Sequence, residues 1–406
     1  MQTNTTDRER TKDHPFGVAI LGCGFVADFY MATLPHHPEI RVVGAFDTDA
    51  ARLDAFSRHH PLRRFASVDE MLHDASVDIV LNLTNPKYHY ATTRQCLDAG
   101  KHVYSEKPLA MTSVEAAELL RLADERGLLL VTAPCSLLST TAQTMWKALR
   151  DGTIGRVRLV YANFDDGMVH RLRPDRWRSA SGAPWPARDE YETGCTYEHA
   201  AYVLSWLAFF FGPARRVQAF ASCQLPDKGV DTDAMAPDFS VGCIEYDGGI
   251  VARVTCSLLA PADKSIVIIG DEGVLYTKYV RDDFSPVYVR KTPPSRIAAS
   301  IGSHLRRWQS RIESWLRFPY SANWSFHRRH RTGPRSSLRL SAVGKPVDFL
   351  LGVSEMIQSL REGRTCRLSP QLGLHMIELV ETLQHPERFE ARRTITSSFD
   401  PIPPRW

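Results

Sequence analysis

The sequence lacks the paired cysteines that hold many metals and redox disulfides. Its eight cysteines are scattered along 406 residues, and none of them forms a C-x-x-C pair. Zinc sites and thioredoxin-like redox motifs depend on such pairs. We therefore expect free thiols, mostly buried, in a reducing cytoplasm, and no metal site.

Long hydrophobic runs are missing as well. The longest apolar run extends over residues 200–211, whereas a membrane-spanning helix needs about 20 residues. The first fifteen residues are polar and charged, without the apolar centre of a signal peptide. These absences predict a cytoplasmic protein with a disordered leader at 1–15.

Acidic residues are almost absent from one stretch, residues 290–345, where thirteen Lys and Arg accompany the single acid Glu313. The whole chain has a formal net charge of only +4. Within the stretch, apolar residues recur at steps of four and three, which predicts one apolar stripe on a helix. The stripe consists of Ile301, Leu305, Trp308, Ile312 and Trp315.

Two hypotheses account for this basic amphipathic insertion, at about 291–345. The helix packs on its own domain or on a dimer partner. Alternatively, residues 298–318 contact an anionic ligand or a membrane surface, which would make the protein peripheral at the inner membrane face. No nucleic-acid-binding fold accompanies the basic residues, so we expect no nucleic-acid partner.

A glycine-rich turn organises the first third of the chain. The apolar run Phe16–Leu21 predicts a strand, and a helical pattern follows at about 25–34. Between them, Gly22, Gly24 and Ala27 form the spacing G-x-G-x-x-A. In a strand–turn–helix context this spacing is a dinucleotide fingerprint, because Gly22 permits the tight turn and Gly24 lets a pyrophosphate approach the backbone.

The start of the following helix completes this predicted phosphate site. Phe25 and Val26 lie where backbone N–H groups point out of a helix N-terminus and attract phosphate. A second apolar strand at 41–46 ends on Asp47, at the position of a ribose-binding acid. A carboxylate there disfavours a 2′-phosphate, so we expect NAD rather than NADP. The alternative is an ordinary aspartate that caps the next helix.

Three more apolar segments, at 77–83, 101–105 and 128–132, alternate with helical patterns. This alternation predicts a doubly wound parallel sheet, in which ligands bind at the carboxyl ends of the strands. Polar residues follow two of these strands: Thr84-Asn85-Pro86, with His89 just after, and Glu106-Lys107-Pro108. Lys107 beside Glu106 fits a surface ion pair. At a cofactor site, the same lysine can polarise a substrate hydroxyl.

These motifs together resemble those of the glucose–fructose oxidoreductase/inositol dehydrogenase family, written Gfo/Idh/MocA. The resemblance covers about residues 16–290 and resumes at Lys345, and Glu106-Lys107-Pro108 is its most specific motif. It implies an NAD-binding Rossmann domain, placed at 16–135, and a substrate and oligomerisation domain at 136–406. It also implies that Lys107 assists hydride transfer between a sugar or polyol carbon and nicotinamide.

The second domain has a different pattern. Short β segments are joined by turn signals at 247–249 and 271–273, which predicts an antiparallel meander. The segments lie at 157–164, 216–222, 239–246, 250–259, 265–269 and 273–279. The resemblance implies an α+β domain with a large, open, mostly antiparallel sheet that often carries the dimer contact. We expect a homodimer or homotetramer.

Two stretches of this domain provide candidate site residues. The resemblance places Trp177 and Arg178 near the mouth of the cofactor and substrate site, although a loop packed on the sheet is the alternative. Family members usually carry Asp and then His at the positions of Glu198 and Tyr202. The departure leaves Tyr202 or His199 as the proton-transfer residue, or Tyr202 as a core side chain.

We therefore predict an NAD-dependent oxidoreductase that acts on a carbinol carbon of a sugar, sugar nucleotide or cyclitol. The predicted cofactor contacts are Gly22, Gly24, Phe25, Val26, Asp47, Thr84, Pro86, His89, Glu106, Trp177 and Arg178. Lys107, Glu198, His199 and Tyr202 are the predicted catalytic residues. Two alternatives stay open: a redox-neutral, glycosidase-like reaction that uses NAD, and a non-catalytic NAD-dependent sensor or regulator.

Overall fold

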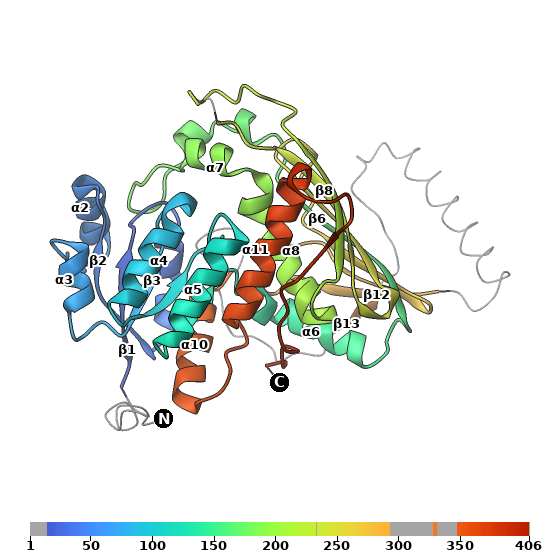
Figure 1. The fold of residues 1–406 in the computed structure, drawn as a ribbon, viewed down its shortest axis with the longest axis horizontal. Helices are drawn as coiled ribbons and strands as arrows, with labels where there is room; N and C mark the ends of the chain where they lie inside the picture. Colours follow the sequence, from blue (N-terminus) through green and yellow to red (C-terminus); the bar gives the residue numbers. More distant parts are fainter. Residues whose placement is uncertain (1–13, 233, 293–327, 331–346, 406) are drawn as a thin grey trace.

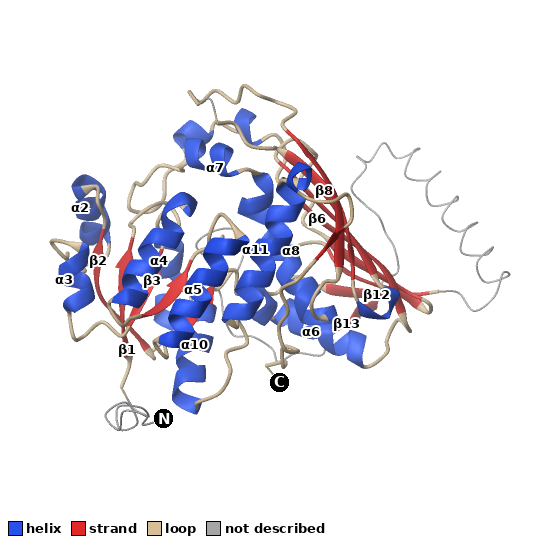
Figure 2. Cartoon of the chain, in the orientation of Figure 1, coloured by secondary structure: helices blue, strands red, loops and turns tan. Residues whose placement is uncertain are grey.

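The computed structural model describes residues 14–232, 234–292, 328–330 and 347–405. Two sheets stand side by side in this part of the chain, with helices packed between and around them (Figures 1 and 2). The predicted leader and the predicted amphipathic stripe at 301–315 lie outside the described residues, apart from the leader's last two positions. Among the described helices, none has the length and apolar character to cross a membrane.

The first sheet has five parallel strands in the order β2-β1-β3-β4-β5. These strands are β1 (Phe16–Leu21), β2 (Ile40–Phe46), β3 (Ile79–Asn82), β4 (His102–Ser105) and β5 (Leu130–Thr132). Every residue of β3 is buried, as expected where helices cover both faces of a parallel sheet. The predicted doubly wound sheet is confirmed, with each strand within a few residues of its predicted place.

Helices alternate with these strands. They are α1 (Ala27–Thr33), α2 (Ala50–His59), α3 (Val68–His73), α4 (His89–Asp98) and α5 (Ser113–Glu125). Ser67 caps α3 by accepting a hydrogen bond from the backbone N–H of Glu70 at 3.0 Å. Thr112 and Glu115 form a reciprocal capping box on α5. The helix starts are therefore set by local sequence.

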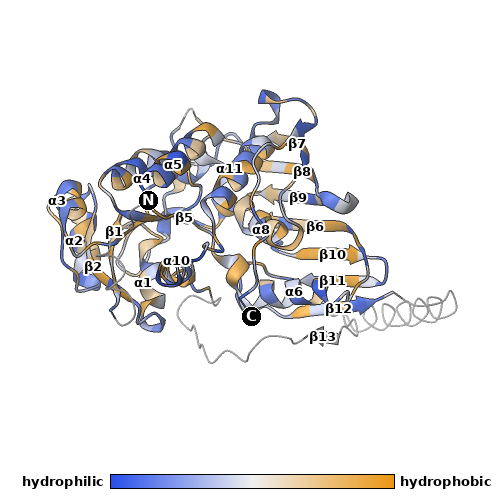
Figure 3. Cartoon of the chain, turned by 60° about the horizontal axis from the view of Figure 1, so that its bottom comes forward, coloured by the Kyte–Doolittle hydropathy of each residue, from blue (hydrophilic) through white to orange (hydrophobic). Residues whose placement is uncertain are grey.

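The second sheet has nine strands in the order β13-β12-β11-β10-β6-β9-β8-β7-β14, and Figure 3 shows them from β7 to β13. Their bounds are β6 (Val157–Asp165), β7 (Arg216–Ser222), β8 (Phe239–Glu245), β9 (Val251–Ser257), β10 (Ile266–Gly270), β11 (Gly273–Thr277), β12 (Val287–Lys291), β13 (Arg328–His330) and β14 (Arg393–Thr394). The prediction of a large, mostly antiparallel sheet is confirmed.

The predicted simple meander is wrong at the centre of this sheet. There β6 lies between β10 and β9 and runs parallel to β9. A parallel pair needs a long crossover, and the segment between these two strands contains two helices and two further strands. The alternation of buried and exposed side chains along β6 is compatible with parallel and with antiparallel pairing. The sequence pattern therefore could not reveal that β6 runs parallel to β9.

Five more helices lie in the described part of the chain: α6 (Thr140–Arg150), α7 (Ala187–Thr193), α8 (Cys195–Phe211), α10 (Leu351–Glu362) and α11 (Pro370–Gln384). Short 3₁₀ turns occur at Leu34–His36, Pro86–Tyr88, Ser136–Leu138, Val169–Arg171, Pro174–Arg176, Asp247–Gly249 and Pro386–Arg388. The helix α8 is almost entirely buried and covers β6 and β9. Val160, Ala162 and Phe164 of β6 are buried, whereas Leu159 and Tyr161 on the opposite face are exposed.

The last two long helices return to the first sheet. The helix α11 packs against α5 and β5 on one side and against α8 and β7 on the other (Figure 1). A Cβ atom added at Gly352 of α10 would lie 2.3 Å from the Tyr104 hydroxyl, so only glycine permits this close approach. Because α11 contacts both sheets, the predicted boundary between 16–135 and 136–406 stays a prediction.

Candidate active site

The glycine turn after β1 has the geometry that a pyrophosphate requires. Gly22 has a φ of 98°, and a Cβ atom there would lie 2.8 Å from the backbone of Leu83. A Cβ atom at Gly24 would meet nothing within 4 Å, so this side of the turn is open. The N–H groups of Gly24, Phe25 and Val26 donate no hydrogen bond to the residues that the structure describes. The turn therefore fits a dinucleotide.

Asp47 lies at the end of β2, beside this turn. Its carboxylate is buried and accepts hydrogen bonds from the backbone N–H groups of Cys23 and Asp49, each at 2.8 Å. Asp49, not Asp47, caps α2 through the N–H groups of Ala51 and Arg52. The alternative role for Asp47 as a helix cap is therefore wrong. Arg52 lies 3.5 Å from the Asp47 carboxylate.

The loops after β3 and β4 are tied together through His89. Its Nδ1 lies 2.6 Å from the Pro108 carbonyl oxygen, and its Nε2 lies 2.7 Å from that of Thr84. Burial lowers the pKa of His89 below its ordinary value despite these two carbonyls. Both ring nitrogens of His89 face backbone carbonyl oxygens. His89, a predicted cofactor contact, therefore fixes the positions of Thr84 and Pro108 and has no ring nitrogen left to bond a cofactor.

Glu106 joins the same loops to the first helix. One carboxylate oxygen accepts a hydrogen bond from the Tyr30 hydroxyl at 2.7 Å, and the other accepts from the Lys107 backbone N–H at 2.9 Å. Thr84 bonds through its hydroxyl to Asn82, and Pro86 begins the short 3₁₀ turn that leads into α4. The predicted cofactor residues of the first sheet thus lie on adjacent loops at one sheet edge.

The Lys107 side chain leaves this edge and reaches the second half of the molecule. Its ammonium lies 2.5 Å from an oxygen of Glu198, in the first turn of α8, and only 15% of the Lys107 side chain is exposed. Burial alone would lower the pKa of Lys107, but the negative charge of Glu198 outweighs burial and raises it above its ordinary value. Lys107 is therefore an ammonium at neutral pH.

His199 follows Glu198 but faces a different partner. Its Nε2 lies 3.2 Å from Asp166, and its ring stacks on Phe164 with centroids 5.0 Å apart. Its Nδ1 is buried without a hydrogen-bond partner in the described chain. Burial, only partly offset by Asp166, lowers the pKa of His199 to about 3. Such a base is poorly matched to proton transfer near neutral pH.

Tyr202 lies one turn further along α8. Like His199, its ring stacks on Phe164, with centroids 5.1 Å apart, and the guanidinium of Arg281 lies 5.1 Å from the centre of the Tyr202 ring. Burial raises the pKa of Tyr202, and the charges of Arg281 and Lys107 oppose that rise. Although its ring packs like a core residue, its surroundings are charged.

Four charged residues of this site were not predicted from the sequence. They are Asp166, Glu190, Lys264 and Arg281, from four separate segments of the second half. Lys264 and Asp166 form an ion pair, and the Lys264 ammonium lies 4.8 Å from the centre of the Phe164 ring. Burial and then the charge of Glu198 raise the pKa of Glu190 well above its ordinary value. The one available signal was the position of Asp166, directly after a strand.

The loop that contains Trp177 and Arg178 approaches the first helix from the second half. Trp177 packs against Trp185 with ring centroids 5.2 Å apart, and Arg178 is exposed and donates hydrogen bonds to backbone carbonyls of its own loop. Ser181, in the same loop, donates hydrogen bonds to Asp28 of α1. The loop therefore lies near the glycine turn, as the prediction for Trp177 and Arg178 requires.

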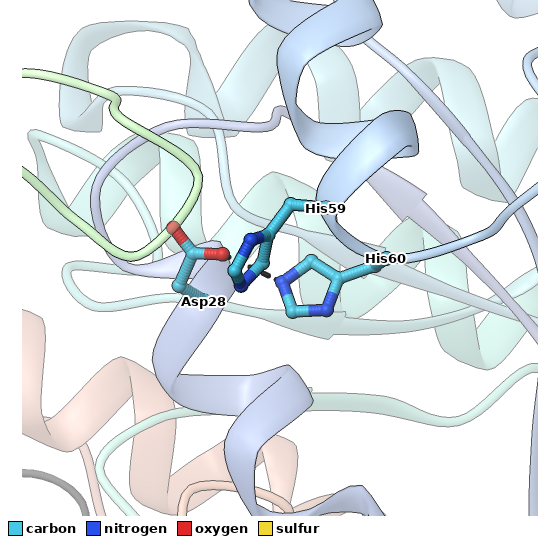
Figure 4. Close-up of side chains that lie close together, drawn as sticks. All are labelled: Asp28, His59 and His60. Carbon is cyan, nitrogen blue, oxygen red and sulfur yellow. Dashed lines mark hydrogen bonds and ion pairs between the residues drawn. The ribbon is translucent and has the colours of Figure 1, made fainter.

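A further polar cluster surrounds Asp28 (Figure 4). Ligand atoms of Asp28, His59 and His60 lie within 4.8 Å of one another, a spacing that a metal ion can use. His60 Nε2 lies 2.6 Å from one Asp28 oxygen, and Ser181 donates to the other. These hydrogen bonds account for the arrangement without an ion, and they join α1, the end of α2 and the loop of Ser181.

Comparison with known proteins places the chain in a family. Residues 16–133 match the oxidoreductase family with an NAD-binding Rossmann fold, and residues 142–276 match the GFO/IDH/MocA C-terminal domain. The chain belongs to the Gfo/Idh/MocA family. It is accordingly a nicotinamide-dependent oxidoreductase, and the resemblance noted in the sequence is confirmed.

Individual relatives of this family show the range of its members. Trans-1,2-dihydrobenzene-1,2-diol dehydrogenase of Bos taurus is 25% identical over 258 residues, which cover 63% of this chain and 72% of the relative. Levoglucosan dehydrogenase, solved with NADH and levoglucosan, shares 15% identity with a TM-score of 0.73 over 95% of this chain and all of that one. The WlbA dehydrogenase from Bordetella pertussis, solved with NADH and UDP-GlcNAcA, shares 19% identity with a TM-score of 0.67 and covers 95% and 99%. These structures share the fold.

Proposed function

We propose that this Gfo/Idh/MocA protein interconverts a carbinol and a carbonyl on a sugar, sugar nucleotide or cyclitol, with NAD as cofactor. The observation that carries the proposal is the Lys107 ammonium, held by Glu198 at the edge where the loops after β1, β3 and β4 meet. Family relatives solved with NADH contain a levoglucosan or a UDP-sugar. When bound, NAD would accept or return the hydride of the reacting carbon.

The first half of the chain would hold the cofactor. Gly22, Gly24, Phe25 and Val26 would bind the pyrophosphate, and Asp47 would bind the adenosine ribose. Thr84, Pro86 and Glu106, positioned by His89, would line the nicotinamide end, with Trp177 and Arg178 over the mouth. Asp47 supports NAD over NADP because its charge disfavours a 2′-phosphate.

Lys107 and Tyr202 would handle the reacting oxygen. Lys107 has N–H groups beyond the one bonded to Glu198, and one of these can donate a hydrogen bond to the substrate oxygen. In the reducing direction, the Tyr202 O–H gives its proton to the oxygen that becomes the hydroxyl. The positive charges of Arg281 and Lys107 stabilise the phenolate that remains. His199 is the weaker candidate because one nitrogen is paired and the other is enclosed.

The test is NADH formation across a panel of polyols, sugars and nucleotide sugars, with wild type and K107M side by side. We expect one class of substrate to yield NADH with wild type and almost none with K107M. Tight copurification of NAD without net NADH from any substrate would favour the redox-neutral alternative. Measurable NAD affinity without turnover of any substrate in the panel would favour the non-catalytic NAD-dependent sensor or regulator.

We further propose a homodimer or homotetramer formed through the outer face of the nine-stranded sheet. Leu159, Tyr161 and Phe220 on β6 and β7 expose 40%, 39% and 56% of their surface, an apolar group that a second sheet could cover. Light scattering should show a mass above the monomer, and Tyr161→Asp should lower it. Retention of the oligomer by that variant would place the interface elsewhere.

The cytoplasmic location stays a proposal. The membrane-surface contact of 298–318 does so too, because those residues lie outside the described part of the chain. Flotation with anionic liposomes tests the contact directly. Wild type should float and a deletion of 298–340 should not. Equal flotation of the two proteins would exclude this contact.

A further inference from the structure

Arg281 is a charged side chain that contacts the Tyr202 ring but has no hydrogen-bond or ion-pair partner in the described chain. It lies in the turn between β11 and β12 and makes neither a hydrogen bond nor an ion pair with any residue of the described ranges. A guanidinium is permanently charged and presents five N–H donors in a fixed plane. Such a group, held inside a site and unpaired, is suited to an anion that arrives from outside.

The two acids that follow Arg281 in the sequence bond to backbone N–H groups and form no ion pair with it. An oxygen of Asp283 accepts the Asp348 backbone N–H at 2.8 Å, and an oxygen of Asp282 accepts that of Phe284 at 2.9 Å. The turn itself is fixed to the start of α6, where Thr141 donates to the carbonyl oxygens of Asp283 and Ser285. Arg281 therefore stands on a rigid support.

Its position relates it to the reacting centre. The guanidinium carbon lies 5.1 Å from the centre of the Tyr202 ring, and Tyr202 follows Glu198 by one helical turn, about 6 Å along α8. Glu198 holds the Lys107 ammonium. Arg281 and Lys107 thus both contact the first two turns of α8, Arg281 at Tyr202 and Lys107 at Glu198.

The other cations of the site are already balanced. Lys107 is paired with Glu198, and Lys264 with Asp166. Glu190 also faces the site, but burial and the Glu198 charge raise its pKa, which favours its neutral form. The charges of Asp166, Glu106 and Glu190 act on the Arg281 guanidinium from a distance, but it forms no direct ion pair within the described residues.

We infer that Arg281 binds an oxoanion of the substrate, either a carboxylate on the sugar or a phosphate attached to it. The inference rests on the proposed function, because it places this anion on the molecule whose hydroxyl contacts Lys107. A carboxylate or phosphate can accept two parallel N–H bonds from one guanidinium, which fixes its orientation as well as its charge. The substrate would therefore be acidic rather than a neutral sugar.

Equilibrium binding tests this without turnover. Calorimetric titration of the protein loaded with NADH would compare D-glucose, D-glucuronate and D-glucose 1-phosphate, in wild type, R281Q and R281K. We expect one of the two anions to bind wild type at least about 10-fold more tightly than glucose, and R281Q to lose that preference. R281K should keep part of it, because lysine retains the charge but not the planar fork.

R253Q is the matched control, since Arg253 also stacks on a tyrosine, with its guanidinium carbon 4.7 Å from the centre of the Tyr161 ring, but is bonded to Asn163. It should bind like wild type. The better of glucuronate and glucose 1-phosphate identifies the oxoanion. If wild type binds neither anion more tightly than glucose, or if R281Q keeps the preference, the inference is overturned.

The same titrations separate this inference from the proposed function. If an anion binds through Arg281 but gives no NADH in the panel, the oxoanion site stands and the assigned reaction fails. If neutral sugars alone are oxidised in a Lys107-dependent way, the reaction stands and the oxoanion site fails. Thermal unfolding of each variant identifies any that has not folded.

Discussion

Two of the buried lysine–carboxylate pairs in the described chain differ in how completely they are bonded. Lys228 and Asp238 lie 2.9 Å apart, and each side chain is only 1% exposed. Lys228 also bonds the Leu225 carbonyl oxygen, while Asp238 accepts the backbone N–H groups of Gln224 and Leu225. The Lys107 ammonium, by contrast, has Glu198 as its one hydrogen-bond partner among the described residues.

This difference separates a structural pair from a functional one. A buried ion pair repays its desolvation when further hydrogen bonds satisfy the remaining donors and acceptors. The Lys228 pair meets that condition within the chain. The Lys107 pair leaves donors available, and so do Arg281 and the turn at Gly24. The lesson is that open bonding positions, rather than burial or charge, mark the site.

The largest expected effect is on catalysis at the open pair. K107M should lower kcat/KM by about 10³-fold or more, about 4 kcal/mol of transition-state stabilisation, because the substrate oxygen loses its charged donor. NAD affinity, measured by fluorescence titration, should change little. K107R is the matched variant, since it keeps the charge. Turnover of K107M within about tenfold of wild type would contradict the assignment.

Substitution in the fully bonded pair, Lys228 and Asp238, should instead lower the free energy of unfolding. K228M leaves a buried carboxylate without its cation, and breaking such a pair costs about 3–5 kcal/mol of unfolding free energy. Urea denaturation measures this loss. The kcat of the folded fraction should match wild type. A change in the kcat of K228M without loss of stability would contradict the distinction between a structural Lys228 pair and a functional Lys107 pair.

Proton transfer is the next test of the open site. Y202F removes the O–H while keeping the ring on Phe164, so we expect kcat to fall about 10²-fold with NAD binding unchanged. H199Q serves as the comparison and should act mainly through packing and the contact with Asp166. A larger loss of kcat in H199Q than in Y202F would transfer the proton-transfer role to His199.

A third pair gives a smaller, pH-dependent effect. Burial opposes the charge on His37, but hydrogen bonds with Asp348 and Glu39 raise its pKa from 6.5 to about 9. Because the folded-state pKa is raised, this stabilisation is complete below about 6.5 and is lost as the pH rises through about 9. H37Q should therefore be about 3 kcal/mol less stable than wild type at the acidic end, with the gap closing as the pH rises through about 9. A gap in urea denaturation that is independent of pH would show that His37 acts through packing alone.

The fold of the first half was predictable because its signals are local. Strands buried on both faces read as apolar runs, and Ser67 marks a helix start by its own side chain. The glycine spacing located the cofactor turn, and Lys107 was found because it follows a strand of that sheet. The residue roles, including the choice between Tyr202 and His199, stay predictions until they are tested.

The other side of the site could not be read from the sequence in the same way. Asp166, Lys264 and Arg281 lie in three separate segments and meet because β10 pairs with β6 and β11 with β10. No short motif records such pairings. Lys264 and Arg281 are single charges near turns, where charged residues are common for reasons of solubility alone. The parallel pairing of β6 with β9 likewise depends on tertiary contacts and not on local sequence.

The return of the last helices to the first sheet has a consequence for synthesis of the chain. The nucleotide-binding half leaves the ribosome long before α10 and α11 exist, and until then Tyr104 and β5 lack the surfaces that cover them. Domains generally fold as units while the chain is made. Here the nucleotide-binding half, which is synthesised first, is covered only after α10 and α11 have been synthesised. A chain that ends before residue 350 would therefore expose the apolar surface around Tyr104 and β5 to chaperones and proteases.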